Sequence, residues 1–575
     1  MSIYDKSSLV LIPSGTKTSK VYSQKPTNGD GDFDFTRSTA ATRVNADGNI
    51  EKETSNLQLH SNNFNAWNYS TGSSATGGQS GYDGNNDAWL LNDSGVAAPT
   101  YAIYRNFSTT GVLTMSLYAK AGTRDVVVFD ITGTNSGQAE FNLTSGTLVS
   151  SSGAINTTIE AVGAAGWYRC SVTCNPSSTI YTRIGAGGAG TIYLQDVQVE
   201  YGLVARDYIE TTTTALYGGI TDNVPRLDYT DGSCPALLLE PQRTNIIANS
   251  EYAGTNNWGN PQRLTTIANQ TTSPEGVVNA TKVNETAVSG THMFDYNFTA
   301  TSGVAYTFSY FAKAAERTQC YLFGYTDGGV FSGQRAIFDL SNGTITSNVG
   351  NGIADIQPYS NGWYRVSLTL TSSATSTAGY WGIGLALNSA TSYLGVASSG
   401  INMYGFQLEA GSYATSYIPT YGVSQTRALD SCSKTGVSSL IGQTEGTMFM
   451  DADFKNNAGD QTILISSSGF NDYVFIQMNS SNVLEAGIVV NAVEVARIGV
   501  GKTSGIYKCA FSYANNDFVF YVNGVKVGTD SSGSMSGFTA DFINLNHNNT
   551  GYSLNNYSLF KTRLTNEELA TLTTI

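Results

Sequence analysis

The sequence is poor in charged residues and has no long apolar run. Only 13% of its 575 residues are charged, about half of what is usual in globular proteins. The formal net charge is −14 at pH 7, whereas nucleic-acid binding needs Lys and Arg to neutralise phosphates. No apolar run reaches the roughly 18 residues of a membrane-spanning helix. We therefore expect neither a nucleic-acid partner nor membrane insertion.

Histidine and paired cysteine are also scarce. The three histidines, His60, His292 and His547, form no HExxH or other metal-binding spacing. The six cysteines include no CxxC pair, and unpaired thiols suit a protein made in a reducing cytosol. The only early apolar stretch, Leu9 to Ile12, is too short for the core of a secretory signal. We expect synthesis in a cytoplasm and no cofactor.

Aromatic residues and glycine are abundant, and their arrangement predicts β structure. Aromatics make up 11% of the chain, and there are 61 glycines. Short β-branched or aromatic segments such as Val126–Phe129 are bounded by Gly, Asn and Ser, which is typical of strands. Only the end of the chain predicts a helix, because Thr565 and Glu568 can form a capping box. The predicted fold class is all-β, with tandem β-sandwich or jelly-roll modules and one short C-terminal helix.

An internal repeat organises the chain. LYAKAGTRDVVVF from Leu117 matches YFAKAAERTQCYLF from Tyr310, and each is followed by a GWYR motif. Ordered matches at near-constant spacing indicate two copies of one module. The predicted divisions are an N-terminal segment 1–55, module 1 at 56–212, a connector 213–236, module 2 at 237–421, and a different β unit at 422–575.

Similar short sequences precede the three large blocks. They are Thr42-Arg43-Val44, Pro225-Arg226-Leu227 and Thr426-Arg427-Ala428. We interpret each Arg as the partner of a carboxylate at a junction between domains. A direct interaction role is the alternative.

The carboxylates offer little for catalysis. Glu200 and Glu409 occupy equivalent places in the two modules, so they would not face one substrate as a glycosidase pair must. Structural pairing with a repeated Arg or Lys, such as Lys120 and Lys313, is the favoured interpretation, and we expect no enzyme activity. Near the N-terminus, three alternating acids resemble half of a calcium loop: Asp30, Asp32 and Asp34. A polar strand face is favoured there, and structural calcium is the alternative.

Some aromatic residues differ between the copies. Trp167 and Trp363 occur in both GWYR motifs and are expected in the core, whereas Thr281 and Thr182 stand opposite Trp89 and Trp381. A tryptophan that one copy lacks is less tied to the fold. We therefore predict Trp89, Tyr82, Trp381 and Tyr380 as sugar-stacking platforms. A polar loop near the C-terminus adds Asn546, His547, Asn548 and Tyr552, with a plain connection as the alternative.

Several segments resemble bacteriophage virion proteins. SLVLIPSGTKTSKVYSQKPTNGDGDFDFTRSTAATRVNADGNIE resembles their N-termini, and NVPRLDYTDGSCPALLLEPQRTNIIANSEY resembles their connectors. FQLEAGSYATSYIPT is similar to phage carbohydrate-binding-like jelly rolls, and YKCAFSYANNDFVFYVNGVKVG with LFKTRLTNEELATL is similar to concanavalin A/laminin-G-like domains. The resemblance implies a structural virion protein, which would be a tail fibre, head fibre or spike that displays glycan-binding modules.

Three functions follow as hypotheses. The first is adhesion to a host surface glycan from the virion surface, with residues 1–55 docking to other virion proteins. The second is a purely architectural capsid or tail component. The third, a surface-polysaccharide depolymerase, is disfavoured because no convergent acid pair is found. Weak modules gain strength from copy number, and fibres are often trimeric, so we expect a homotrimer.

Overall fold

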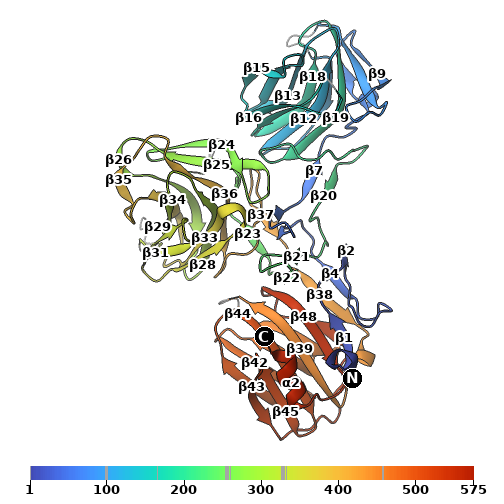
Figure 1. The fold of residues 1–575 in the computed structure, drawn as a ribbon, viewed down its shortest axis with the longest axis vertical. Coiled ribbons are helices and arrows are strands. Elements are labelled where there is room, and N and C mark those ends of the chain that lie inside the picture. The colour runs from blue at the N-terminus through green and yellow to red at the C-terminus, as the bar shows by residue number, and fades with distance from the viewer. Residues whose placement is uncertain are drawn as a thin grey trace.

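The computed structural model describes residues 2–96, 101–164, 166–252, 258, 261–325, 330–331, 333–455 and 459–574. The described part is built almost entirely of antiparallel sheets, so the all-β prediction is confirmed. Figure 1 shows three sandwich-like lobes. Sandwich 1, built from the strands between residues 68 and 201, is at the top, and sandwich 2, built from the strands between residues 264 and 410, lies beside the middle. The third lobe holds both chain ends. No helix in the described residues is long and apolar enough to cross a membrane.

Sandwich 1 consists of two six-stranded sheets. The first has the order β16 (Asn156–Ala161), β17 (Trp167–Cys174), β12 (Leu113–Ala121), β19 (Gly190–Tyr201), β10 (Ala88–Asp93), β9 (Ser74–Gln79). The second has the order β15 (Thr147–Ser152), β14 (Gly137–Asn142), β13 (Val126–Thr134), β18 (Ser178–Gly185), β11 (Ile103–Asn106), β8 (Asn68–Tyr69). Alternate residues of each strand point inward, and on β13 the inward residues Val127, Phe129 and Ile131 are fully buried.

Sandwich 2 repeats this strand order. Its first sheet runs β32 (Ile353–Pro358), β33 (Trp363–Thr371), β28 (Ala305–Ala314), β36 (Gly400–Ala410), β25 (Val278–Glu285), β24 (Leu264–Thr272). Its second runs β31 (Thr344–Val349), β30 (Arg335–Asp339), β29 (Gln319–Gly324), β34 (Ser376–Ala386), β27 (Met293–Ala300). Trp258 bridges to Tyr296 of β27, at the place that β8 takes beside β11. The shared order agrees with the sequence repeat.

The third lobe, here called the terminal sandwich, combines both ends of the chain. Its first sheet contains β21 (Leu227–Asp228), β22 (Ala236–Leu239), β48 (Tyr552–Phe560), β39 (Glu445–Phe454), β44 (Gly505–Ala514), β45 (Asp517–Val522), β46 (Val525–Asp530) and, beside β48, β1 (Ser7–Leu11). Its second contains β2 (Thr16–Lys17), β3 (Lys20–Val21), β4 (Phe33–Thr36), β38 (Ser431–Thr435), β47 (Phe542–Asn544), β40 (Gln461–Ser466), β41 (Tyr473–Met478), β42 (Val483–Val490), β43 (Val493–Gly501).

This arrangement corrects the predicted division at residue 55. Strand β1 pairs with β48, and β4 pairs with β38, so the blue N-terminal strand lies within the red C-terminal lobe (Figure 1). Leu9, Leu11, Phe33 and Phe35 are fully buried in its core. Residues 1–55 are therefore not a separate segment. The predicted connector 213–236 likewise contributes β21 and the first residue of β22 to this lobe.

Short elements lie outside the main sheets and close the chain. Two-stranded sheets join β7 (Thr54–Asn56) to β20 (Leu216–Gly218), β23 (Arg243–Asn245) to β37 (Gln425–Arg427), β26 (Ser289–Thr291) to β35 (Ser392–Leu394), and β5 (Arg43–Val44) to β6 (Ile50–Glu51). Helix α2 (Asn566–Thr573) begins with the expected capping box of Thr565 and Glu568, and it buries Leu569 against the terminal sandwich. A second, four-residue helix, α1 (Ile3–Lys6), precedes β1.

A buried ion network lies where sandwich 2, the linking segments and the terminal sandwich meet. Arg226 contacts Glu240 at 2.7 Å and also contacts Asp430. Arg427 contacts Glu240 at 2.8 Å, and Arg37 contacts Asp430 at 3.1 Å. Burial would raise the pKa of Glu240, but Arg427 and Arg226 hold it well below its usual value. The junction interpretation is thus confirmed for Arg226 and Arg427.

The third predicted Arg behaves differently. Arg43 pairs with Glu51 at 2.8 Å across the β5–β6 hairpin, and both side chains remain partly exposed.

A separate buried network joins sandwich 1 to sandwich 2. Lys52 contacts Glu251 and also contacts Glu275, the latter at 2.6 Å. Arg206 contacts Glu275 as well. Burial would raise the pKa of Glu275, but Arg206 and Lys52 lower it to about 2.

The two classes of ion pair predict different stability effects. We expect Arg226→Ala to destabilise the chain by about 3–5 kcal/mol, because it removes the buried guanidinium that contacts both Glu240 and Asp430 and leaves each carboxylate with a single Arg contact. Arg43→Ala, the matched control, should cost less than about 1 kcal/mol because its pair is partly solvated. Denaturant unfolding of the full chain measures both. Equal effects would contradict the structural role assigned to the buried network.

Candidate functional site

Trp381 is not available to a ligand. Its side chain is 0% exposed and lies in the core of sandwich 2, where the ring is 5.7 Å from Phe308 and 5.3 Å from Phe331. Strand β34 points residue 381 inward and its neighbour Tyr380 outward, because side chains alternate along a strand. The predicted sugar platform at Trp381 is therefore wrong, whereas Tyr380 lies on the outer face.

The other predicted aromatic residues are largely occupied by contacts within sandwich 1. Trp89 is half-buried, and its Nε1 donates to the Asn62 carbonyl at 3.0 Å. Tyr82 stacks on Tyr118 with ring centroids 3.8 Å apart. The Tyr82 hydroxyl donates to Asp196 at 3.1 Å, whose pKa burial raises to about 7. Both rings therefore have aromatic contact partners within sandwich 1, Trp89 with Phe64 and Tyr82 with Tyr118.

The C-terminal loop does not form the predicted site either. Tyr552 is fully buried in the core of the terminal sandwich, and Asn546 is buried with its amide donating to the Asp430 carbonyl at 3.0 Å. His547 packs against Phe470 with centroids 5.3 Å apart. Asn548 is exposed and donates to Thr462 at 2.9 Å. The buried pair supports the fold, so this group does not present a common surface.

The N-terminal acids have separate partners. Asp34 pairs with Lys20, Asp32 accepts from the Ser23 amide at 3.0 Å, and Asp30 accepts from the Asn28 side chain at 2.6 Å. Within the described residues, no three His, Cys, Asp or Glu side chains are grouped to hold a metal ion. The favoured interpretation, a polar strand face, is confirmed for Asp34, which is exposed between buried Phe33 and Phe35 on β4.

Glu200 and Glu409 have equivalent structural roles. Each accepts a 2.7 Å hydrogen bond from the side chain of the glutamine two residues earlier. Glu200 also accepts a bond from the backbone amide of Arg206, and Glu409 accepts one from the backbone amide of Thr415. Glu409 also lies 3.8 Å from Arg243. The predicted structural role of Glu409 beside a basic residue is therefore confirmed with Arg243, whereas the two lysines named as examples, Lys120 and Lys313, are not its partners. Lys120 instead lies over the ring of Tyr193.

An aromatic strip lies on the outer face of sandwich 2. It comprises Tyr321, Phe323, Tyr325 and Tyr380, with successive ring centroids 5.6, 5.8 and 6.3 Å apart. Their inward neighbours on β29, Cys320 and Leu322, are fully buried. Exposure rises along the strip, from 2% at Tyr321 to 38% at Tyr325. The strip is therefore anchored at one end and open to solvent at the other.

Two glycines let these rings lie flat on the sheet. A Cβ at Gly382 would meet the Phe323 ring at 1.9 Å, and one at Gly384 would meet the Tyr321 ring at 2.2 Å. In the sheet register, Asp295 and Phe323 both pair with Gly382, and Arg335 pairs with Phe323. Across the sheet, the row of positions is thus Asp295, Gly382, Phe323 and Arg335. We did not predict three members of the strip from the sequence: Tyr321, Phe323 and Tyr325. The signal was present in the sequence, because these aromatic residues and the two glycines Gly382 and Gly384 stand at alternate positions.

In sandwich 1, the row of positions equivalent to Asp295, Gly382, Phe323 and Arg335 carries different side chains. There Tyr104, Arg183, Asp130 and Gln138 are neighbours in register. Arg183 forms two bonds with Asp130, at 3.0 and 2.5 Å, and lies 4.1 Å over the ring of Tyr101. The row that carries a ring over glycine in sandwich 2 therefore carries an ion pair in sandwich 1.

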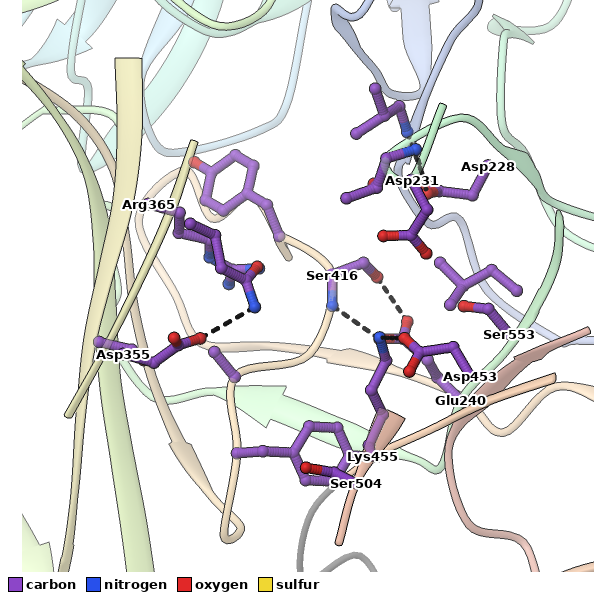
Figure 2. Close-up of a pocket in the computed structure, with 18 of the residues that line it drawn as sticks. Asp228, Asp231, Glu240, Asp355, Arg365, Ser416, Asp453, Lys455, Ser504 and Ser553 are labelled. Carbon is purple, nitrogen blue, oxygen red and sulfur yellow. Dashed lines mark hydrogen bonds and ion pairs between the residues drawn. The ribbon is translucent and has the colours of Figure 1, made fainter. Parts of the chain in front are cut away.

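A cavity of about 440 Å³ lies between sandwich 2, the linking segments and the terminal sandwich. Figure 2 shows Asp355 and Arg365 on one side and Asp228 and Asp231 on the other. Its size lies within the usual range for small-molecule sites. The ion network around Glu240 forms part of its wall, which fixes the three surrounding parts relative to one another.

The position of Trp381 generates a stability prediction. Trp381→Ala should destabilise the protein by about 3–5 kcal/mol, as expected when a buried aromatic side chain is removed. Tyr380→Ala, at the adjacent and partly exposed position, should cost much less. Unfolding followed by circular dichroism compares the two. A negligible loss for Trp381→Ala would contradict its assignment to the core.

Comparisons with known proteins find structural similarity only. No protein-family model and no curated protein matches the chain. A CBM40 module of a Ruminococcus gnavus IT-sialidase bound to α2,3-sialyllactose is 13% identical, with 23% of this chain and 83% of that chain covered and a TM-score of 0.21. A botulinum neurotoxin type C structure has 13% identity, coverage of 25% and 39%, and a TM-score of 0.22. A tandem CBM22 domain from Paenibacillus barcinonensis has 11% identity, coverage of 62% and 96%, and a TM-score of 0.20. These similarities assign no ligand to this chain.

Proposed function

We propose that this chain is a structural virion protein, a fibre or spike, that adheres to a host surface glycan. The aromatic strip of sandwich 2 is the observation that carries the adhesive part of this proposal. The virion part depends on the resemblance of the N-terminal and connector sequences to bacteriophage virion proteins. The proposed role involves no catalysis.

The strip has the features that a sugar-binding face requires. Aromatic rings provide flat apolar surfaces with little conformational freedom, and pyranose rings have apolar faces of matching shape. The Phe323 ring lies on Gly382, and Asp295 and Arg335 stand in the same row of positions. The Asp295 carboxylate can accept hydrogen bonds from sugar hydroxyls, and the Arg335 guanidinium can donate hydrogen bonds to them. The strip therefore combines stacking with polar contacts.

The sheet beneath the strip makes it rigid. The inward side of β29 and β34 packs in the main core of sandwich 2, and Tyr321 joins Met293, Ile337 and Ala386 in a small apolar cluster on the outer side. A ring already held in place loses little conformational entropy on binding.

The proposal includes a homotrimer, because weak single sites gain strength from copy number. Light scattering that gives the 61.1 kDa of one chain would contradict the trimer.

A binding experiment tests the adhesive function. The full chain carrying Tyr325→Ala and Tyr380→Ala should bind a glycan array with affinity reduced about tenfold or more, because buried aromatic anchors commonly contribute upward of about 1–2 kcal/mol. Tyr217→Ala is the matched control, since Tyr217 is 53% exposed and lies on the β7–β20 link. No glycan binding by the unmodified chain, or equal binding by all variants, would favour the architectural alternative.

The virion assignment has its own test. We expect antibodies against residues 430–575 to label tails or capsid vertices in electron micrographs of a culture that produces the particle. Gold on cell surfaces beside unlabelled particles would contradict it. Because strands β1 to β4 of the N-terminal segment are built into the terminal sandwich, we propose that docking to other virion proteins involves that whole lobe.

A further inference from the structure

We propose that a second cavity, beside the two-stranded sheet β7–β20, takes an arginine side chain of a partner polypeptide. The cavity has a volume of about 400 Å³ and is lined by sandwich 1, by β7 and β20, and by residues 418–427 around β37. Tyr217 and Val423 line it and are 53% and 59% exposed, so its opening to solvent is apolar. The proposal uses a different site from the aromatic strip and does not depend on a glycan ligand.

The two modules differ at an equivalent buried glutamate. In sandwich 2, the Oε2 atom of Glu409 accepts from the Thr415 hydroxyl at 2.7 Å and lies 3.8 Å from Nε of Arg243. In sandwich 1, Glu200 is 1% exposed and lines the cavity, but its Oε2 atom has no hydrogen-bond partner in the described structure. Leaving a buried acceptor unpaired is costly. Sandwich 1 therefore lacks a partner that sandwich 2 supplies from within the chain.

The missing partner is an arginine. Asn56 and Asn245 occupy equivalent places, because each amide donates to two backbone carbonyls in the same way. Two residues before them stand Thr54 in sandwich 1 and Arg243 in sandwich 2. Thr54 and Glu200 both line the cavity. The place beside the buried glutamate that a guanidinium fills in sandwich 2 is thus an open cavity in sandwich 1.

The strand opposite shows a second loss of positive charge. Arg427 pairs in register with Arg243, whereas Gly218 pairs with Thr54. Arg427 itself also lines the cavity, but Glu240 holds it in the buried junction network at 2.8 Å. Sandwich 1 therefore has neither of the two arginines that lie at this place in sandwich 2.

A second carboxylate at the cavity also has no partner. Glu53 lines the cavity and makes no hydrogen bond or ion pair within the described part of the chain. Burial and the nearby Asp222 carboxylate raise the pKa of Glu53 to about 7, and burial also raises the pKa of Glu200. The residue of sandwich 2 at the place of Glu53 is the uncharged Gln242. Sandwich 1 thus has an additional acid where it lacks two bases.

The basic residues near Glu200 do not replace the missing arginines. Arg206 is paired with a buried acid of sandwich 2, and Arg169 donates to a hydroxyl and to a backbone carbonyl. Both act on the Glu200 carboxylate only from a distance, and its pKa is still raised. Sandwich 2 has Arg365 in the place of Arg169, so Arg243 acts there in addition to it.

A guanidinium in the cavity can stabilise both carboxylates. In sandwich 2, Glu409 is 0% exposed, and Arg243 acts on it across 3.8 Å rather than through a hydrogen bond. A ligand can therefore act on the buried Glu200 carboxylate at similar range, because charges attract strongly where water is excluded. The same guanidinium would donate to Glu53, which is only partly buried.

The lining favours an arginine over other cations. Among the described residues, no three His, Cys, Asp or Glu side chains are grouped to hold a metal ion. The aliphatic stem of an arginine can pass along apolar surface while its charged end reaches the acids. The exposed Tyr217 and Val423 at the opening would then contact the residues on either side of that arginine, which favours a polypeptide over a free small cation.

Calorimetric titration of the full chain with the blocked tripeptide leucine–arginine–leucine tests the inference. We expect binding that is at least tenfold weaker when citrulline replaces arginine, because citrulline is nearly isosteric but uncharged. Affinity should rise as the pH increases through about 7, since Glu53 then becomes ionised. Blocked arginine alone should bind more weakly than the tripeptide.

Two variants of the cavity test the residues. Glu53→Gln should weaken tripeptide binding about tenfold, whereas Glu160→Gln, at an exposed acid of β16 outside the cavity lining, should leave it unchanged. Thr54→Arg should abolish binding without lowering the melting temperature, because it supplies from within the chain the arginine that sandwich 2 already has.

Four outcomes would overturn the proposal. They are no binding of the tripeptide, equal binding of the citrulline form, unchanged binding by Glu53→Gln, or equal affinity for blocked arginine alone, which would remove the polypeptide partner. Tyr217→Ala should weaken tripeptide binding and leave glycan binding unchanged, whereas Tyr325→Ala with Tyr380→Ala should do the reverse. The arginine site and the proposed adhesive function therefore fail separately.

Discussion

The arrangement of the chain depends on the buried contact between Arg226, Glu240 and Asp430. Arg37 and Arg427 complete this network, so it joins an N-terminal strand end, the segment between the modules, and the segment after module 2. Burying charges is costly unless each is paired, and alternative arrangements of these segments would leave charges unpaired. The network therefore favours one arrangement of sandwich 2 against the terminal sandwich. The cavity of Figure 2 exists because that arrangement is fixed.

The path of the chain has a second consequence. Because β1 and β4 pair with β48 and β38, the terminal sandwich needs strands from both ends of the sequence. The two modules are in effect insertions into this lobe, and each leaves and returns through short two-stranded links such as β7–β20 and β23–β37. A lobe assembled this way buries the N-terminal strands that would otherwise expose unpaired edges. It also holds both modules out from one base, which suits the display of binding faces.

Much of this organisation could be predicted from the sequence, and the failures have physical causes. Repeated motifs revealed the modules, and repeated Arg positions revealed the junction. The prediction of Trp381 as a sugar platform was wrong because a tryptophan that one module lacks can still be buried in the core of the other module. At the equivalent place sandwich 1 buries Thr182, whose hydroxyl bonds to Gln58 at 2.8 Å, so each copy fills its core differently. The terminal sandwich was divided wrongly because pairing between strands more than 500 residues apart leaves no local signal.

The two modules show which face is free to acquire function. Inward residues of both are apolar because the core demands it, and Ile184 and Ile383 occupy matching places. The outward row of the same strands carries Arg183 with Asp130 in one copy and Gly382 under Phe323 in the other. A difference this large within one strand order is tolerated only where packing does not dictate the residue. Tyr321 is buried in a small apolar cluster, whereas Tyr325 and Tyr380 at the open end of the strip are more exposed. Because these two rings contribute less to packing than the core beneath them, contact with a ligand is the role we propose for them.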